Sequence, residues 1–567
     1  DIIFQGSDGG SSITALTLDM SEAGTATFGG GVIIEGVSDS SDGLHLKDRT
    51  FIAFSDDSSV VSRFRSSSAG VFQFQDASFN TRVELNNSGN VAATSYNGIP
   101  FYSNGSSFYT HDVSGTDDNA HGNTGFGYLS LDAITTGDGN TAVGRIAGSA
   151  LNTGEQNVII GSYAGDALTS GSYNIAIGVG ALGLEDNHGK NVAIGYIALG
   201  NQNAGADAYN TAVGFEAGKS VTTGVNNILI GALAGDALTT GANNIAIGYL
   251  ALTTEDTTGK NVAVGNSALR DLNAGTDAFN VAIGHEAGLA MTTGLSNTLI
   301  GGLAGDALTT GSDNVAVGVQ ALSSEDTGGR NVAMGRYALQ NQNYDGFAYN
   351  VAVGHSAGST ISTGIANVII GGLAGDALTE GSGNVAIGYQ ALSSEDGHGT
   401  NVAIGHNSLA TLNADADAYN VAVGYNSGMG ISTGTGNTIV GGTAGDALTT
   451  GVDNVAVGYL ALSTEDTGSK SVAVGRKALF AQNYDGEAYN VAVGFDAGMS
   501  LATGTINTLI GALAGDALDI GNSNVAIGYN SLSAEDGHGG NVAVGTNALT
   551  AQNAGATGYN TAVGHNA

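Results

Sequence analysis

Two acidic motifs recur at fixed intervals along the sequence and could bind a cation. The motif Gly-Asp-Ala-Leu occurs six times, with its aspartate at Asp166, Asp236, Asp306, Asp376, Asp446 and Asp516. A Glu-Asp pair follows each copy, beginning with Glu185 and Asp186. Because carboxylates and turn carbonyls suit Ca²⁺, these turns are candidate calcium sites. The alternative, which we favour, is that the aspartates bond turn amides and that the chain has no cofactor. The tandem Gly-Gly-x-Gly-x-Asp nonapeptides of calcium-binding β-rolls do not occur.

Tyrosines recur in a second set of segments and could form a recognition surface. The segments vary from copy to copy and include Tyr209, Tyr344, Tyr349, Tyr484 and Tyr489. Tyrosine often anchors binding surfaces for sugars and proteins, so these loops are candidates for recognition. The alternative, slightly favoured, is a solvated loop whose tyrosine packs on the neighbouring repeat.

Histidine is too irregular to indicate catalysis or metal ligation. His188, His398 and His538 each follow a Glu-Asp pair, but the other three copies of the motif have no histidine there. Surface variation explains this pattern better than ligation. A glycine motif at 381–386 imitates a dinucleotide-binding loop but lacks the strand–turn–helix context. Because a repetitive chain offers no single constellation in a cleft, we expect no enzymatic activity.

A short sequence repeat positions the acidic and tyrosine-containing motifs along the chain. The pattern Asn-x-x-x-Gly begins at Asn123 and occurs 26 times up to Asn560, with Ser471 once in place of asparagine. Successive steps of 17, 17, 17 and 19 residues give a 70-residue superrepeat that first starts at Asn140. The second repeat of each superrepeat carries Gly-Asp-Ala-Leu, the third carries Glu-Asp, and the fourth carries the variable segment.

This repeat predicts an all-β fold, a parallel β-solenoid or β-roll of about 26 coils. A run such as Val192–Ile194, bounded by Asn191 and Gly195, is typical of a short strand between turn formers. We expect a second strand at 196–199, with Thr-Thr-Gly and Asn-Ala-Gly stretches as turns. If each coil advances by about 4.8 Å, the array spans about 125 Å. The sequence therefore predicts a rod.

Stacking of the coils predicts two ladders of identical residues. The asparagines, exemplified by Asn140, Asn157, Asn174 and Asn191, would join successive coils through side-chain amide hydrogen bonds. The glycines, exemplified by Gly144, Gly161, Gly178 and Gly195, would supply a backbone angle that other residues adopt only with strain. We assign both sets a structural role.

The first 122 residues lack the repeat. We predict a β-rich domain at 1–122 and a solenoid domain at 123–567, joined near 116–119. Segments at 60–65, 71–75 and 82–85 have strand character, which indicates an antiparallel or interwoven region that caps the first coil. Because the chain begins without Met and ends within a coil, we expect the natural product to be longer.

Composition disfavours several classes of partner. The formal net charge is −36, whereas nucleic-acid binding requires a basic surface. No stretch of 18 apolar residues occurs, so we expect no membrane insertion. Cysteine is absent, which removes disulfide scaffolds and thiolate metal sites.

The Asn-x-Ala-x-Gly coils resemble the parallel β-roll heads of trimeric autotransporter adhesins, although those coils are usually shorter. Together with the opening at 1–10 and the stretch at 13–28, they resemble bacteriophage tail fibres, particularly those of marine phages. The resemblance covers 1–36 and 123–567. It implies a homotrimer, an extracellular location on a virion or a cell surface, and attachment to a host cell-surface receptor, such as a glycan. Such fibres often end in a self-cleaving chaperone domain that is removed after assembly.

The strand pattern gives an independent argument for a trimer. Successive side chains point to opposite faces, and both faces are apolar, with Val192 and Ile194 on one and Ala193 on the other. One face can fill the coil, and neighbouring chains would cover the other. Larger residues in each second coil, such as Ile159, Leu229 and Leu299, would form a periodic plug at the trimer axis. The alternative is one wide coil that buries both faces itself.

These expectations converge on a structural fibre. We expect a phage tail fibre or virion appendage that acts as a rigid spacer and host-surface adhesin. The alternative is a bacterial surface adhesin or an extracellular matrix fibre. A polysaccharide-degrading tailspike is a third candidate, but no pair of acids marks such a site.

Overall fold

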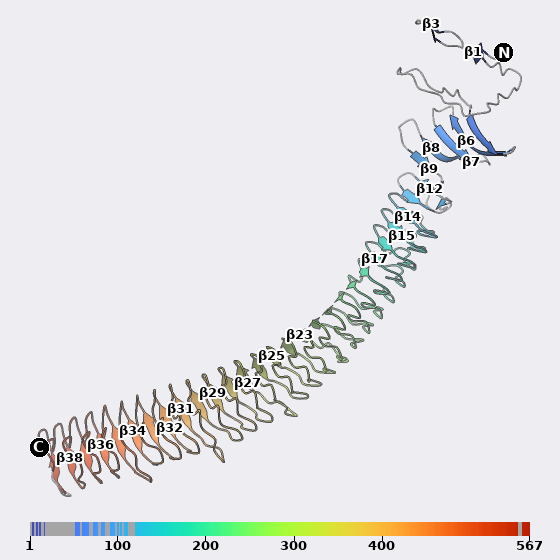
Figure 1. Cartoon of the computed structure of the whole chain (residues 1–567). Helices are drawn as coiled ribbons and strands as arrows, with labels where there is room; N and C mark the ends of the chain where they lie inside the picture. Colours follow the sequence, from blue (N-terminus) through green and yellow to red (C-terminus); the bar gives the residue numbers. More distant parts are fainter. Residues whose placement is uncertain are drawn as a thin grey trace. The chain divides into compact units, whose positions relative to one another are not determined.

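The computed structural model describes residues 107–110, 119–553 and 558–567 in full, and before them the backbone of the assigned strands. The chain divides into two bodies, Asp1–Phe101 and Tyr102–Ala567. The described parts contain strands and turns and no helix (Figure 1). The predictions made for the opening motifs and for the joint at 116–118 fall on residues outside this description.

The first body contains a five-stranded antiparallel sheet in chain order. Its strands are β5 (Phe51–Asp56), β6 (Ser59–Ser66), β7 (Phe72–Asp76), β8 (Thr81–Leu85) and β9 (Val91–Ala93). The three strand predictions in this region are therefore confirmed, and the pairing is antiparallel. Three short antiparallel pairs complete the strands of this body: β1 (Ile3–Phe4) with β4 (Leu16–Thr17), β2 (Ser7–Asp8) with β3 (Ser11–Ser12), and β10 (Ser95–Tyr96) with β11 (Ile99–Pro100).

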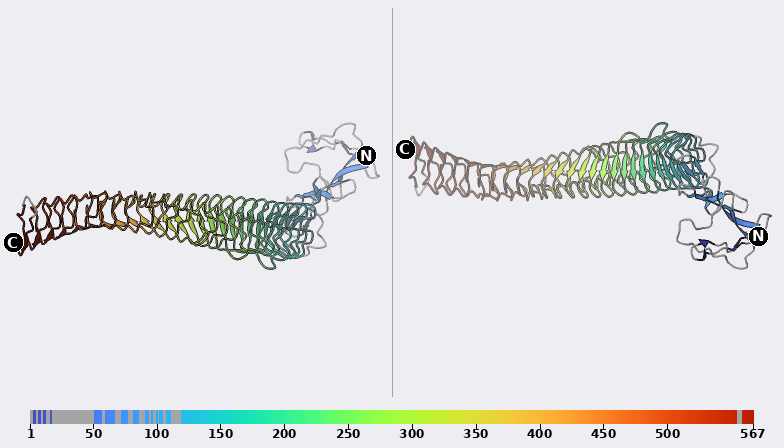
Figure 2. Two further views of the ribbon diagram at one scale, coloured as in Figure 1. Left: turned by 90° about the horizontal axis from the view of Figure 1, so that it is seen from below. Right: turned by 90° about the horizontal axis from the view of Figure 1, so that it is seen from above.

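The second body is the predicted parallel β-solenoid, organised on one 28-stranded sheet. A hairpin of β12 (Tyr102–Asn104) and β13 (Ser107–Tyr109) opens the sheet, and β13 then pairs in parallel with the first coil. This body spans Tyr102–Ala567, and its repeated coils begin with the strand Thr124–Phe126. Figure 2 shows the row of coils from two further sides.

Each coil contributes one strand of three residues to the sheet. The strands are β14 (Thr124–Phe126), β15 (Thr141–Val143), β16 (Val158–Ile160), β17 (Ile175–Ile177), β18 (Val192–Ile194), β19 (Thr211–Val213), β20 (Ile228–Ile230), β21 (Ile245–Ile247), β22 (Val262–Val264), β23 (Val281–Ile283), β24 (Thr298–Ile300), β25 (Val315–Val317), β26 (Val332–Met334), β27 (Val351–Val353), β28 (Val368–Ile370), β29 (Val385–Ile387), β30 (Val402–Ile404), β31 (Val421–Val423), β32 (Thr438–Val440), β33 (Val455–Val457), β34 (Val472–Val474), β35 (Val491–Val493), β36 (Thr508–Ile510), β37 (Val525–Ile527), β38 (Val542–Val544) and β39 (Thr561–Val563). Equivalent residues pair throughout, as Ala142 does with Ile159.

The glycine that ends each strand explains why the strand is short. Gly195 has a φ of +140°, which L side chains rarely adopt. A Cβ built at this position would lie 2.0 Å from the carbonyl oxygen of Gly214 in the next coil. The chain turns at this residue, and the backbones of adjacent coils approach each other too closely for any side chain. The predicted glycine ladder is confirmed at Gly144, Gly161, Gly178 and Gly195, which all have φ between +136° and +140°.

The second strand that we predicted at 196–199 is wrong. This segment is a turn, in which Ile197 and Leu199 adopt left-handed backbone angles of +53° and +48°. The turn directs Leu199 into the interior, where it is fully buried. Hydrophobic burial of this leucine favours the turn over a regular strand, although left-handed angles are unfavourable for leucine.

The asparagine ladder is present, but most of its hydrogen bonds differ from the predicted ones. The Asn140 side-chain oxygen accepts a bond from the backbone N–H of Asn157 at 2.9 Å. Its amide nitrogen donates to the Gly154 carbonyl at 2.9 Å. Most of the asparagines thus bind the neighbouring backbone through both the side-chain oxygen and the side-chain nitrogen. Hydrogen bonds between two side-chain amides are fewer. At the one serine in the ladder, Ser471, the Gln482 side chain donates to the hydroxyl at 2.8 Å.

The core explains why the superrepeat is four coils long. Ile159, in the middle of β16, is fully buried inside its own coil, so the predicted plug at a trimer axis is wrong. A Cβ at Gly148 would meet its Cδ1 atom at 2.8 Å. In the third and fourth coils the large residue lies in the turn instead of the strand. The strand centre is alanine, as at Ala176, and the turn carries a buried leucine, as at Leu182. Large and small residues thus compensate between neighbouring coils.

Candidate functional site

One buried glutamate stands in the third coil of each superrepeat. The six residues, all with no exposed surface, are Glu185, Glu255, Glu325, Glu395, Glu465 and Glu535. At Glu325, one carboxylate oxygen accepts the Gly328 N–H at 2.7 Å, and the other accepts the Tyr344 N–H at 3.4 Å. Burial nevertheless raises the pKa of Glu325 to about 7. Burial also raises the pKa of Glu185, Glu395 and Glu465.

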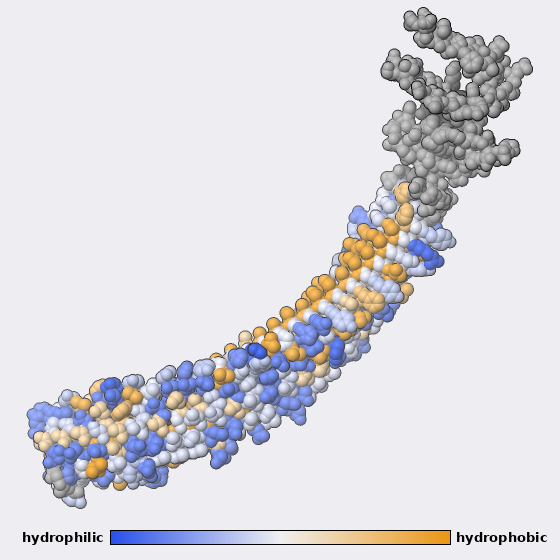
Figure 3. Space-filling model, in the orientation of Figure 1, coloured by the Kyte–Doolittle hydropathy of each residue, from blue (hydrophilic) through white to orange (hydrophobic). Residues whose placement is uncertain are grey.

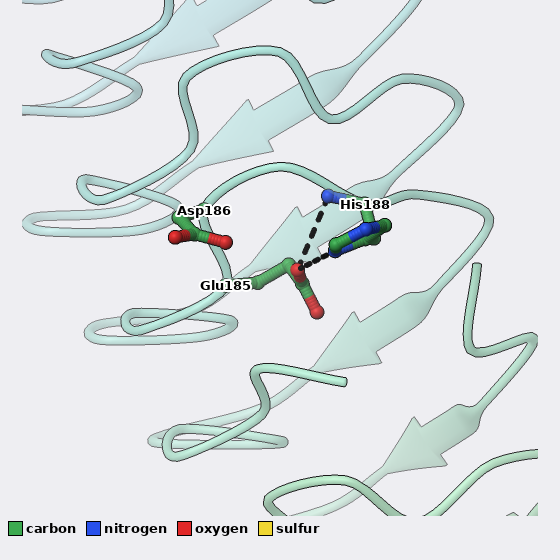
Figure 4. A group of neighbouring side chains, drawn as sticks. All are labelled: Glu185, Asp186 and His188. Atoms are coloured by element: carbon green, nitrogen blue, oxygen red, sulfur yellow. Dashed lines mark hydrogen bonds and ion pairs between the residues drawn. The ribbon is translucent and has the colours of Figure 1, made fainter. Parts of the chain in front are cut away.

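Three of these glutamates form a cluster with a histidine and a second acid. The clusters are Glu185–Asp186–His188, Glu395–Asp396–His398 and Glu535–Asp536–His538, and in each one the donor atoms lie within 4.8 Å of one another. Figure 4 shows the Glu185 carboxylate turned toward the His188 ring. In the described part of the chain, no other group of three potential ligands from His, Cys, Asp or Glu occurs. We therefore regard this loop as the candidate functional site.

The fold brings together the Glu-Asp pair and the histidine, to which we assigned separate roles from the sequence. From the sequence, the Glu-Asp pair was a candidate calcium site, and the histidines were interpreted as surface variation. The backbone turn over 185–188 places the His188 Nδ1 atom 3.6 Å from the Glu185 carboxylate. The signal that could have joined them is the spacing Glu-Asp-x-His itself, which occurs three times at equivalent positions of the superrepeat.

The six aspartates of the Gly-Asp-Ala-Leu motif do not gather into a metal site. Burial raises the pKa of each of them. Asp236 accepts a hydrogen bond from the Thr253 hydroxyl in the next coil. Equivalent aspartates are four coils apart, or about 19 Å, and none belongs to a cluster of three ligands among the described residues.

The tyrosine loops lie against the preceding coil. The Lys190 ammonium donates to the Tyr209 hydroxyl at 3.0 Å and lies 2.6 Å from the Asp207 carboxylate. Arg330 donates to the Tyr349 hydroxyl at 2.6 Å, and Lys470 lies over the Tyr489 ring. These contacts favour the packing alternative, although the Tyr209, Tyr349 and Tyr489 rings remain about half exposed.

Tyr344 and Tyr484 instead connect their loops to the glutamates of the third coil. The Tyr344 N–H bonds to Glu325, and the Tyr484 N–H bonds to Glu465 at 3.3 Å. The two candidate sets from the sequence, the acidic turns and the tyrosine loops, are therefore neighbours in two superrepeats.

A further row of aromatic residues was missed by the sequence reasoning. It lies at the position after the strand glycine, where Tyr196 stacks on Phe215 with ring centroids 5.3 Å apart. The His406 ring lies between Tyr389 and Tyr425, at 5.3 Å and 5.4 Å from them. These contacts follow from the coil spacing, which brings equivalent positions of adjacent coils to about 4.8 Å. The recurrence of rings at this position was visible in the sequence.

The outer face of the sheet forms an apolar strip. In every strand from β15 to β38 the central side chain is buried in the coil, and the two flanking side chains point outward with partial exposure. Ile228 and Ile230 are 40% and 37% exposed. Figure 3 shows apolar side chains gathered in a band along the coils nearer the N-terminal end of the row. Such a long uncharged surface is unusual for a free protein face.

No family model, curated protein or solved structure matches the chain. No helix among the residues that the structure describes is long and apolar enough to cross a membrane.

Proposed function

We propose that the chain is a structural fibre, a phage tail fibre or a related virion appendage, that acts as a rigid spacer and attaches to a host-cell surface. The observation that carries the proposal is the in-register stacking of one strand from every coil, from β14 to β39. Each interface repeats the same backbone, asparagine and core contacts. A stack of this kind extends in one direction, and each coil contacts only its neighbours, which suits a spacer.

The proposed assembly is a parallel homotrimer held together by the apolar strip. The outward residues of the strip are valine, isoleucine and threonine, except for Phe126 in β14 and Met334 in β26. A partner that fits it needs a complementary apolar surface with the same period of about 4.8 Å. A second copy of this chain in parallel register offers that surface, and three copies around one axis would cover all three strips.

The oligomeric state tests this proposal. We expect light scattering coupled to gel filtration to give about three times the chain mass of 56.0 kDa. Lysine in place of Ile230, Ile300 and Ile370, which are 36–37% exposed, places charge on the strip and should release single chains. The control places lysine at Ala206, Thr276 and Ala416, which are exposed in fourth-coil loops, and should leave the trimer intact. Wild-type protein that elutes as a single chain would refute the trimer.

Attachment requires a separate experiment. Fluorescently labelled fibre should bind a subset of a panel of intact bacteria, and a glycan array should identify a saccharide ligand if the receptor is a glycan. Binding to no bacterial surface and to no glycan would leave only the spacer role. The alternative function, a bacterial surface adhesin or matrix fibre, predicts binding to animal or plant surface ligands instead.

A further inference from the structure

We propose that the three Glu-Asp-x-His loops each bind a divalent transition-metal ion of the Zn²⁺ type. The ligands are the buried glutamate, the histidine and the adjacent aspartate, with water completing the coordination. Mixed imidazole and carboxylate ligands suit zinc, whereas Ca²⁺ takes six to eight oxygen ligands. This inference concerns a binding site within single coils and is independent of the proposed fibre function.

The distances match a metal site. The histidine Nδ1 atom and the glutamate Oε1 atom lie 3.6 Å apart in the Glu185 loop, 3.9 Å in the Glu395 loop and 3.0 Å in the Glu535 loop. Bond lengths of about 2.0–2.2 Å in a tetrahedral zinc site place two ligand atoms about 3.4 Å apart. The three observed distances therefore lie on both sides of the distance that a zinc ion requires between two ligand atoms, and the backbone need not rearrange.

The second observation is the incomplete hydrogen bonding of the buried carboxylates. Glu185 and Glu535 are fully buried, and in each one the Oε2 atom has no hydrogen-bond partner. The buried Nδ1 atoms of His188 and His398 also lack one. A neutral imidazole nitrogen and a carboxylate oxygen that face each other repel unless a cation or a proton lies between them. Either an Nδ1–H donor of the histidine or a bound cation meets this requirement.

Two of the three loops without histidine provide natural controls, whereas the third, at Glu255, shares the unpartnered Oε2 atom of Glu185 and Glu535. Glu325 and Glu465 have both carboxylate oxygens hydrogen-bonded, and no histidine follows them. A Cβ at Gly328 would lie 2.5 Å from the backbone oxygen of Tyr344, so a larger residue there would force the backbone to shift. Thr258 already has a side chain at this position, and its N–H bonds to Glu255 at 3.2 Å, the same distance as from His188 to Glu185.

The stoichiometry of zinc binding tests the proposal on the full-length chain. Equilibrium dialysis against ZnCl₂ followed by elemental analysis should give three ions per chain, one for each cluster. Replacing all three histidines by threonine (His188→Thr, His398→Thr and His538→Thr) should lower the zinc affinity at these loops by at least about tenfold. Because threonine occurs at the equivalent position 258, the variant should fold. Cobalt should give visible absorption bands in the wild type that the triple variant lacks.

A gain of binding provides the sharpest test. Thr258→His should create a fourth site and raise the stoichiometry by one ion per chain. The control replaces His285, His355 and His406, which lie outside the clusters, by asparagine and should change nothing. Zinc bound equally by the wild type and the triple variant would overturn the proposal. An absence of zinc binding would overturn it too, and would assign the contact to a histidine that donates a hydrogen bond from Nδ1.

Discussion

At the scale of single residues, the strand glycines are the least replaceable positions of the solenoid. Two separate requirements meet at Gly195: a left-handed φ and a distance of 2.0 Å from its missing Cβ to the Gly214 oxygen. Gly205 shares only the first requirement, because it has a φ of +71° and a Cβ placed there would have no atom within 4 Å. Substitutions at Gly195 and Gly205 therefore distinguish the cost of backbone strain from the cost of steric overlap.

We expect Gly195→Ala to destabilise the chain by on the order of 3–5 kcal/mol, because the methyl group forces two backbones apart. Gly205→Ala should cost only about 1 kcal/mol, the strain of a left-handed alanine. Equilibrium denaturation followed by circular dichroism measures both. Equal losses would mean that the φ angle alone selects glycine at these positions.

At the scale of the coil, size complementarity between neighbours sets the core. The Leu229 side chain, in the middle of β20, fills the space left by Gly218 and Gly235, where a Cβ would approach it to 2.5 Å and 2.8 Å. No atom of the turns can replace it, so its removal leaves a cavity between coils. The larger residue in each second coil therefore supports the coils on both sides.

Leu229→Ala should cost about 2–5 kcal/mol through this cavity. Leu184→Ala makes the same chemical change at a side chain that is 55% exposed, and should cost less than about 1 kcal/mol. Denaturant unfolding of the two variants measures the difference. A small loss at Leu229 would indicate that the coils close around the vacated space.

At the scale of the whole molecule, buried acids connect stability to pH. The six motif aspartates and four of the buried glutamates have a raised pKa because burial disfavours their charged form. Such groups bind protons more tightly in the folded state than in the unfolded state. Asp207 and Glu487 behave oppositely, because Lys190 and Lys470 lower their pKa.

Stability should therefore fall as the pH rises through the window of the buried acids. For Glu325 that window runs from its ordinary value of 4.5 to about 7, and the contribution is fully present below it. We expect a lower melting temperature at pH 8 than at pH 5.5, and a smaller difference in Glu325→Gln. Measurement in about 0.5 M salt screens the general repulsion of a chain with net charge −36. A melting temperature that rises with pH in this window would contradict the burial of the acids.

The order of residues along the chain was enough to predict the architecture. Asparagine, a β-branched strand and glycine recur at a fixed spacing, and stacked coils place the equivalent residues of successive repeats above one another. The same spacing predicted the coil number, the strand at each coil and both ladders. Three features became known only from the folded chain: how the turn at 196–199 runs, that Ile159 faces its own core, and that Glu185 meets His188. The physical reason is that these features depend on which way a side chain points after a glycine turn. Contacts between adjacent backbones fix that direction, and no local pattern of residue types records it.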